Sequence, residues 1–234
     1  MHSSGGEGLQ DVGVVIVAAG SGSRMLGTDK VWADLAGEPI IARTLQAFER
    51  CAEVGRIVVV CADGQEGRIV ELGAAIGLAK LQEVCPGGET RQESVRFGLL
   101  RLGECELVAV HDCARPLVSQ TIIQRGLALA RERGSALCSV RAKNTIKVVE
   151  GGRVLATPQR ESLWEAQTPQ VFRYTELLSA HVAAAQSGAA FTDDAALMEA
   201  TGRDVWVYEG SYRNLKVTTP EDLLVARALW EGEV

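Results

Sequence analysis

Residues 14–30 read VVIVAAGSGSRMLGTDK, and the rest of the chain can be placed around this stretch. Residues 14–19 are apolar and start with four β-branched side chains, which is typical of a short strand buried on both faces. The run ends at Gly20, and the following loop contains serines, a second glycine, Arg24 and Lys30. Exposed backbone N–H groups together with positive charge suit a polyphosphate, so this loop is the first candidate for a binding site.

Three kinds of phosphate-binding loop can follow such a strand. A dinucleotide fingerprint needs a third glycine where Met25 stands, and a Walker loop needs a lysine directly after Gly27. The third kind is a nucleotidyltransferase loop, whose backbone surrounds a triphosphate while Arg24 and Lys30 neutralise the phosphorus under attack. The backbone groups would belong to Gly20, Ser21, Gly22 and Ser23. On this segment alone, a glycine-rich turn with solvated cations stays an open alternative.

Composition limits the class of protein. A chain of 234 residues with 47% hydrophobic residues fits one domain with a real core, which we expect to span residues 12–234. The formal charge of −6 and the isoelectric point near 5.2 disfavour a nucleic-acid partner, because such proteins need a basic face. Any anion site must therefore be local.

The expected location is the cytoplasm, without membrane contact. Residues 1–11 lack the apolar segment of a signal peptide and are expected to be disordered. No stretch reaches the 18 or so apolar residues of a membrane span. The six cysteines form no CxxC pair, so we expect reduced, mostly buried thiols without a disulfide or a zinc site.

Short apolar strands alternate with amphipathic helices along most of the chain. Further strands are expected at residues 56–62, 79–84, 107–111, 164–172 and 204–208, and helices at 40–48, 65–75, 89–101, 174–186 and 220–231. Thr192 should cap another short helix. This alternation predicts an α/β fold, a three-layer and mostly parallel Rossmann-like sheet, whose ligands bind beyond the carboxyl ends of the strands.

Three loops fall at that edge of the predicted sheet. They are GSGSR after the first strand, PGGETR after the third and HDCARP after the fourth. Glycines such as Gly87 and Gly88 allow the backbone to approach a ligand without an intervening side chain. The three loops together define a candidate site.

Residues 141–163 differ in character from the rest. Residues 145–150 and 153–157 flank Gly151-Gly152, a pair favoured in two-residue hairpin turns. An isolated hairpin is marginal in water, so this β-arm should pack on something. A second copy of the chain, giving a homodimer, is the preferred partner; packing back on its own sheet is the alternative.

With these residues placed, the chain resembles a known family. The motifs AAGSGSRM, the lysine at position 30, PGGETRQESV, HDCARP, RESLWEAQTPQVF, TDDA and NLKVTTPEDL occur in the order seen in 2-C-methyl-D-erythritol 4-phosphate cytidylyltransferases of the non-mevalonate isoprenoid pathway. The resemblance covers the chain from residue 12 onward. It implies a nucleotidyltransferase sheet with a protruding β-hairpin arm that exchanges between two subunits.

The resemblance also implies a reaction and a set of residues. CTP and methylerythritol 4-phosphate would give the CDP-alcohol and pyrophosphate, with magnesium held mainly by phosphate and possible help from Asp112. Arg24 and Lys30 match the pair that stabilises the transition state, and Arg160 and Lys216 match the pair that positions the sugar phosphate. The cytidine-contacting segments match Ala18, Ala19, Gly87, Gly88 and Ser94, and positions near the sugar match Asp112, Arg115, Thr145, Thr168 and Thr192.

This chemistry agrees with the residue types. A phosphate monoester is already anionic at neutral pH, because its second pKa is about 6, so no general base is needed. His111 is accordingly interpreted as a hydrogen-bonded residue at a strand end. Two other functions stay open from the sequence: a ribitol-5-phosphate cytidylyltransferase, and a nucleotide-binding regulatory module without turnover.

Overall fold

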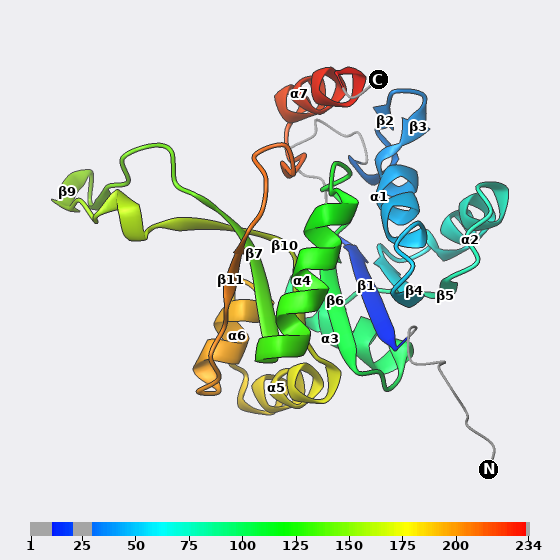
Figure 1. Ribbon diagram of the computed structural model, residues 1–234, viewed down its shortest axis with the longest axis horizontal. Helices are drawn as coiled ribbons and strands as arrows, with labels where there is room; N and C mark the ends of the chain where they lie inside the picture. The colour runs from blue at the N-terminus through cyan, green and yellow to red at the C-terminus, as the bar shows by residue number, and fades with distance from the viewer. Residues whose placement is uncertain (1–10, 21–29, 233–234) are drawn as a thin grey trace, which may run out of the picture.

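The computed structural model describes residues 11–20 and 30–232. They form a seven-stranded sheet with helices on both faces (Figure 1). Its strands are β1 (Val12–Ala18), β4 (Val54–Cys61), β5 (Leu81–Pro86), β6 (Leu107–Asp112), β7 (Ser135–Arg141), β10 (Trp164–Arg173) and β11 (Val207–Glu209). Across the sheet the order is β11-β7-β10-β6-β1-β4-β5; β10 is antiparallel to both neighbours and the other pairs are parallel. The predicted three-layer, mostly parallel α/β fold is confirmed.

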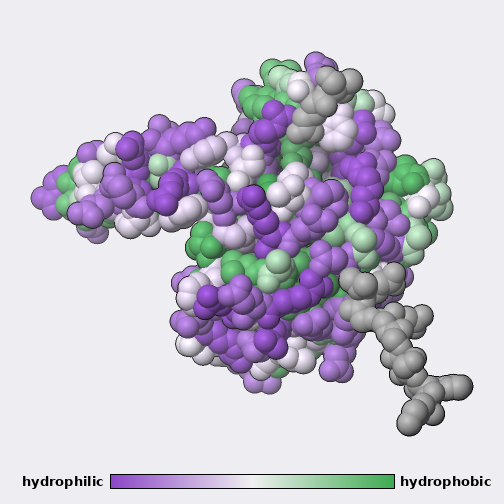
Figure 2. All heavy atoms as spheres, viewed as in Figure 1, coloured by the Kyte–Doolittle hydropathy of each residue, from purple (hydrophilic) through white to green (hydrophobic). Residues whose placement is uncertain are grey.

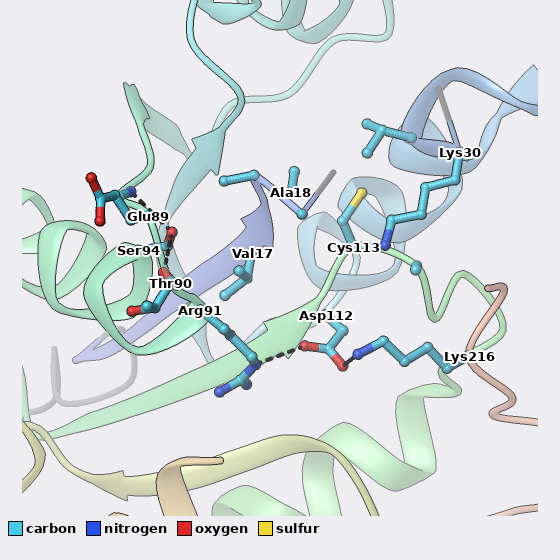
Figure 3. A pocket seen from close by; sticks show the side chains of 15 residues that line it. Val17, Ala18, Lys30, Glu89, Thr90, Arg91, Ser94, Asp112, Cys113 and Lys216 are labelled. Atoms are coloured by element: carbon cyan, nitrogen blue, oxygen red, sulfur yellow. Dashed lines mark hydrogen bonds and ion pairs between the residues drawn. The ribbon is translucent and has the colours of Figure 1, made fainter. Parts of the chain in front are cut away.

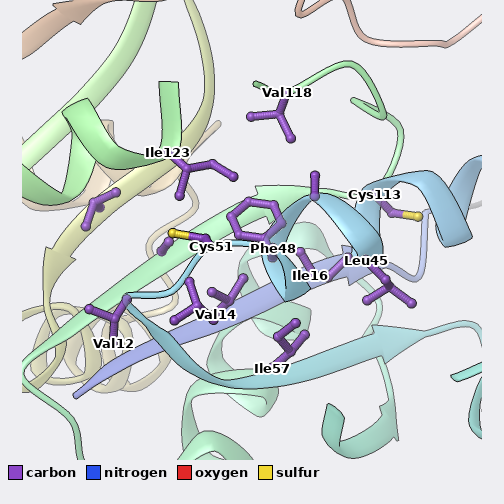
Figure 4. Close-up of a cluster of buried hydrophobic side chains, with 14 of the residues drawn as sticks. Val12, Val14, Ile16, Leu45, Phe48, Cys51, Ile57, Cys113, Val118 and Ile123 are labelled. Atoms are coloured by element: carbon purple, nitrogen blue, oxygen red, sulfur yellow. The ribbon is translucent and has the colours of Figure 1, made fainter. Parts of the chain in front are cut away.

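The central strands bury both faces, as the apolar run in the sequence predicts. Along β1, Val14 and Ile16 face one layer of helices, whereas Val15 faces the other, because neighbouring side chains point to opposite sides of a strand. Phe48 lies in the first cluster, next to Val14 and Ile16, and is fully buried (Figure 4). Complete burial of one such side chain contributes about 1.5–3 kcal/mol, so this layer fixes the position of β1 firmly.

Helices from distant parts of the chain form the two outer layers. Side chains of α1 (Ile40–Glu49), α2 (Glu66–Ala75) and α4 (Gln120–Arg133) contribute to one core cluster, and those of α3 (Arg91–Leu102), α5 (Tyr174–Ser187) and α6 (Asp194–Ala200) to the other. A third, smaller cluster joins α7 (Pro220–Glu231) to the short hairpin of β2 (Asp34–Leu35) and β3 (Glu38–Pro39). The 3-10 turn η1 (Lys30–Trp32) lies between β1 and that hairpin.

The structure differs from the sequence-based expectations in several connections. Residues 117–140, for which no element was expected, form α4 and β7, and Ser119 caps α4 by accepting a hydrogen bond from Ile122 N. The last strand covers Val207–Glu209 rather than 204–208. The expectation that Thr192 caps α6 is wrong: the cap is Asp193, whose Oδ1 accepts from Ala196 N at 2.9 Å.

The hairpin projects from the body as a separate two-stranded sheet, formed by β8 (Val148–Glu150) and β9 (Arg153–Ala156) (Figures 1 and 2). Gly151 and Gly152 have φ values of 55° and 80°, the backbone region that the predicted glycine turn requires. Every residue of both strands is exposed. The alternative that the hairpin packs on its own sheet is therefore wrong for this chain alone.

All six cysteines are buried and unpaired. Within the residues that the structure describes, no helix is both long enough and apolar enough to cross a membrane.

Candidate active site

A cavity of about 450 Å³ opens beyond the carboxyl ends of the central strands (Figure 3). Its walls come from the ends of β1 and β6, the turn after β5 with the start of α3, the first turn of η1, and the segment before α7. The lining residues are Val17, Ala18, Ala19, Gly20, Lys30, Val31, Gly88, Glu89, Thr90, Arg91, Ser94, Asp112, Cys113, Ala114 and Lys216. The predicted edge of the sheet therefore does carry the site.

One wall is formed by the turn after β5, where Gly88 lines the cavity and the neighbouring Gly87 is closely packed behind it. A Cβ atom on Gly87 would lie 2.4 Å from the Cβ of Ala19 and 2.8 Å from the Oγ of Ser94, so only glycine fits there. Ser94 Oγ accepts from Gly88 N at 3.1 Å and donates to Thr90 O at 2.9 Å. Ser94, predicted as a cytidine contact, thus holds the turn that forms this wall.

The opposite side carries Lys30, the first residue of η1. Its Nζ would be 3.4 Å from a Cβ on Gly20, which places the ammonium group over the end of β1. In Figure 3, Lys30 and Lys216 both extend toward the space beside Asp112. The structure thus brings together two of the predicted cations, although they are 186 positions apart. The other predicted loop residues, Ser21, Gly22, Ser23 and Arg24, lie outside the described residues.

Asp112, at the end of β6, is surrounded by positive charge. Its Oδ1 lies 3.2 Å from Arg91 Nε, and its Oδ2 lies 2.7 Å from Lys216 Nζ and 3.9 Å from Arg115 Nε. Burial alone would raise the pKa of Asp112, but the charges of Arg91, Lys216 and Arg115 outweigh it and hold this pKa well below its usual value. The carboxylate is therefore ionised at any physiological pH.

Thr168 and His111 fix the backbone behind Asp112. Thr168 Oγ1 accepts from Asp112 N at 3.0 Å and lies 3.1 Å from His111 Nδ1. His111 Nε2 lies 3.1 Å from the carbonyl oxygen of Arg115, which can only accept, so Nε2 carries the proton and Nδ1 accepts from Thr168. Thr168, predicted near the sugar substrate, is buried with its hydroxyl engaged on both sides.

Burial lowers the pKa of His111 to about 3, so this ring is neutral. Its two nitrogen atoms both have partners within the protein. The interpretation of His111 as a hydrogen-bonded residue at a strand end is confirmed.

Three residues of the site were not singled out from the sequence. Arg91 lines the cavity and also pairs, through Nη1, with Asp194 Oδ2 at 2.8 Å. Asp194 Oδ1 lies 2.9 Å from His181 Nε2, and both of these side chains are 1% exposed. Arg91 and Asp194 belong to the quoted motifs PGGETRQESV and TDDA, which was the available signal, whereas nothing in the sequence pointed to His181.

Other predicted residues lie outside this cavity. Arg115 is buried beside it, where its Nη1 donates to Asn214 O at 2.7 Å. Thr192 is exposed, just before α6. Thr145 and Arg160 belong to the arm, both are exposed, and Arg160 Nη1 donates to Lys143 O at 3.4 Å. In the single chain, the arm residues are therefore separate from the cations at the sheet edge.

The cavity offers few side chains that could bind a divalent metal among the described residues. Among residues 11–20 and 30–232, no group of three or more His, Cys, Asp or Glu side chains could hold a metal ion. Asp112 is one of two acidic residues lining the cavity, and three cations already surround it. A magnesium ion at this site would therefore be held mainly by the phosphates of a substrate, with Asp112 as the carboxylate that could add to them.

Known proteins resemble this chain over nearly its full length. The model of the family described as 2-C-methyl-D-erythritol 4-phosphate cytidylyltransferase matches residues 12–231. A protein of that name from Desulforamulus reducens is 46% identical over 225 residues, which cover 94% of this chain and 96% of the relative. One from Geobacillus kaustophilus is 44% identical over 216 residues, covering 92% and 95%.

Solved structures agree with these relatives. The crystal structure of 4-diphosphocytidyl-2C-methyl-D-erythritol synthase from Anaerococcus prevotii matches with a TM-score of 0.84 and 28% identity, over 95% of this chain and 99% of that one. The 2-C-methyl-D-erythritol 4-phosphate cytidylyltransferase of Thermus thermophilus matches with a TM-score of 0.77 and 32% identity, over 93% and 98%.

A three-layer α/β sheet whose carboxyl edge combines a glycine-walled cavity with facing lysines is the fold and site of a nucleotidyltransferase, and this chain is such an enzyme. More narrowly, it belongs to the 2-C-methyl-D-erythritol 4-phosphate cytidylyltransferase family.

Proposed function

We propose that this protein transfers CMP from CTP to 2-C-methyl-D-erythritol 4-phosphate. A phosphate oxygen of the acceptor attacks the α-phosphorus of CTP and forms the new P–O bond. The bond from the α-phosphorus to the bridging oxygen breaks, and pyrophosphate leaves with its electrons. The products are 4-diphosphocytidyl-2-C-methyl-D-erythritol and pyrophosphate. The observation that carries the proposal is the single cavity shared by Lys30, Lys216 and Asp112 beside a wall of glycine backbone.

The main obstacle in this reaction is the repulsion between two polyanions. Unit charges 4 Å apart interact by about 4 kcal/mol at an effective dielectric constant of 20. Lys30 lies at the β1 side, where the triphosphate would meet the backbone of Gly20. Lys216 lies at the β6 side, where it would receive the acceptor phosphate. Arg24 is proposed to act with Lys30. Cations at both sides would hold the reactants in line, and such positioning is most of the catalysis in phosphoryl-type transfer.

No protein base is required for this transfer. The attacking phosphate is mostly dianionic at neutral pH, since its second pKa is about 6. His111, next to Asp112, is neutral, with both ring nitrogens committed to Thr168 and the carbonyl of Arg115. Its role is therefore to support Asp112 and not to move a proton.

Magnesium is proposed as the metal, with Asp112 as the carboxylate that could contact it. When bound, the ion would neutralise part of the triphosphate charge and bind its oxygens. The chain's own contribution is to keep Asp112 ionised among Arg91, Arg115 and Lys216.

The arm is proposed to complete the site of a second subunit in a homodimer. Ile146, Val148, Val149, Val154 and Leu155 are between 42% and 54% exposed on the hairpin, a degree of apolar exposure that a partner would cover. Tyr212 fixes the base of the arm by donating to Arg141 O at 2.7 Å. Arg160 and Thr145 lie on the arm, so in such a dimer they would act on the partner's acceptor.

The acceptor is tested with a panel of polyol phosphates. With CTP and magnesium, pyrophosphate release should be fast with 2-C-methyl-D-erythritol 4-phosphate and slow with ribitol 5-phosphate. Faster release with ribitol 5-phosphate would show that the proposed acceptor is wrong.

Lys30→Ala should lower turnover by about 100-fold or more, while the Kd of CTP in calorimetry changes much less. An equal loss of CTP binding would contradict the transition-state role of Lys30.

Mixing two inactive variants tests the cross-subunit assignment. Lys30→Ala and Arg160→Ala should each be inactive as homodimers. In a mixed dimer one site would combine Lys30 of the second variant with Arg160 of the first, so random exchange should restore about a quarter of wild-type activity. Absence of recovery, with mixed dimers verified by native mass spectrometry, would place both residues in one subunit's site.

The cytoplasm is the proposed location, and residues 12–234 the proposed enzyme domain. Six buried, unpaired cysteines support a reducing compartment, because oxidising compartments favour disulfides. The chain's net charge of −6 supports small-molecule partners over nucleic acid.

A further inference from the structure

Arg91 connects the cavity to a carboxylate that lies outside it. It starts α3, lines the cavity and is 25% exposed as a side chain. Its Nε contacts Asp112 Oδ1 at 3.2 Å, and its Nη1 contacts Asp194 Oδ2 at 2.8 Å. One guanidinium group is therefore shared between a carboxylate in the cavity and a second carboxylate in the core.

Asp194 has no exposed surface with which to meet a substrate. It is 1% exposed and does not line the cavity, and its second oxygen, Oδ1, lies 2.9 Å from His181 Nε2. Burial alone would raise the pKa of Asp194, but Arg91 and His181 outweigh this effect and lower it. Asp194 is thus a charged group that the fold retains in its interior, where an unpaired charge would be very costly.

The backbone that carries Asp194 is itself fixed to the sheet. Gln170, 1% exposed on β10, accepts from Ala195 N at 3.0 Å through Oε1 and donates to Asp193 Oδ2 at 2.9 Å through Nε2. Gln170 lies two residues after Thr168, which holds the backbone of Asp112. Two residues of β10 therefore hold the backbone at or next to both carboxylates that share Arg91.

A fixed Arg91 matters because a free arginine has many conformations. Ordering such a side chain costs rotamer entropy, and an anchored guanidinium has already met this cost before substrate arrives. Released from Asp194, Arg91 could turn away from Asp112. Asp112 would then lose the contact that orients Oδ1 and, with it, the orientation of Oδ2 toward Lys216.

We propose that Asp194 is a positioning residue for the acceptor end of the site, which acts through Arg91 on Asp112 and Lys216. The inference rests on the proposed function, because acceptor binding is the property that Asp194 would control. His181 supports Asp194 from the side away from the cavity.

Asp194→Asn tests the proposal, because it removes the charge with little change of shape. The KM for 2-C-methyl-D-erythritol 4-phosphate should rise about tenfold and kcat should fall, since a shift of about 1 Å in a positioning group has effects of this size or larger. The Kd of CTP in calorimetry should stay within about twofold, because the glycine wall is unchanged. Asp194→Glu should recover most of the loss. Glu176→Gln, which removes an ion pair with Arg203 on the surface of α5, is the matched control.

A double-mutant cycle shows whether Asp194 acts through Arg91. In an Arg91→Gln background, Asp194→Asn should add little to the change in acceptor KM. Additive effects would overturn the proposal. So would a lower kcat in proportion to the folded fraction with an unchanged KM, since that is the result of a purely structural role.

If Asp194→Asn fails to fold, His181→Leu replaces it, since it removes one of the two partners of Asp194 and does not touch the cavity. A rise in acceptor KM of a few fold would support the proposal, and an unchanged KM would overturn it. The wild type separates this inference from the function on which it rests. If the wild type does not use the acceptor at all, the proposed function fails; if it does and the variants keep the wild-type KM, only the role of Asp194 fails.

Discussion

A methyl group at position 87 would close the narrow contact between the ends of β5 and β1. The Cβ of Gly87→Ala would lie 2.4 Å from Ala19 Cβ, whereas ordinary contacts begin near 3.4 Å, so the two loops must separate by about 1 Å. Such overpacking costs about 1–3 kcal/mol of stability where the fold must absorb it. If the loops separate instead, the wall of the cavity shifts.

The expected result is therefore a loss of nucleotide binding. A displacement of about 1 Å in a positioning wall can lower activity by about 100-fold, and we expect the Kd of CTP to rise at least tenfold. Calorimetric titration with CTP measures this directly, and circular dichroism during urea unfolding measures the stability change. Ala19→Gly removes the methyl group that the new Cβ would contact, so the double variant with Gly87→Ala and Ala19→Gly should recover part of the CTP affinity.

Gly67→Ala is the matched control. Gly67 lies within α2, and no atom beyond its chain neighbours and the backbone of its own helix lies within 4 Å of an added Cβ. Alanine is favoured over glycine inside a helix by about 1 kcal/mol, so this variant should be at least as stable as the wild type, with unchanged kinetics. If Gly87→Ala keeps the wild-type CTP affinity and turnover while folded, the close contact does not shape the nucleotide site.

Three further outcomes follow from the buried residues and the arm. Thr168→Val leaves Asp112 N and His111 Nδ1 buried without partners and should lower the free energy of unfolding by about 2–4 kcal/mol, whereas Thr168→Ser should stay near the wild type in urea unfolding. Burial lowers the pKa of His111 to about 3, so between about pH 6.5 and pH 3 this ring binds a proton in the unfolded chain but not in the folded chain. The free energy of unfolding is therefore not reduced by His111 above about pH 6.5, and it should decrease by on the order of 1 kcal/mol per pH unit as the pH falls toward 3. His111→Asn should flatten that slope between pH 6.5 and 5. Val149→Glu, on the exposed arm, should shift the protein toward monomer in light scattering without lowering its unfolding free energy; a stable dimer would contradict the proposed interface.

The sequence could predict features that depend on neighbouring residues. The apolar run at 14–19 specifies β1 by its own pattern, and Gly151-Gly152 specifies its turn because both positions need positive φ. Loops that follow parallel strands must meet at one edge, so the place of the cavity could also be predicted. For α4 the signal lies in Ser119, a good helix cap by type, and in the apolar spacing after it.

Other features depend on contacts that no local pattern specifies. Arg91 and Asp194 are 103 positions apart, and they meet only because α3 and α6 pack on the same face of the sheet. Thr192 and Asp193 are both good helix caps by type, and the structure uses Asp193, which also accepts a hydrogen bond from Gln170 of β10. The sequence places Asp112 at a strand end, but no local pattern shows that three cations surround it.

The charges around Asp112 explain how an acidic chain can hold an anion site. Arg91, Arg115 and Lys216 are balanced by Asp112 and Asp194, which leaves one net positive charge in this cluster, and Lys30 faces it from the η1 side. Arg115 is held by Asn214 O and Arg91 by Asp194, whereas the side chain of Lys216 is 38% exposed. An incoming phosphate would therefore reach the ammonium group of Lys216 more easily than either arginine. The two arginines would meanwhile keep Asp112 ionised and in place, so that Asp112 holds Lys216 in position for the acceptor phosphate.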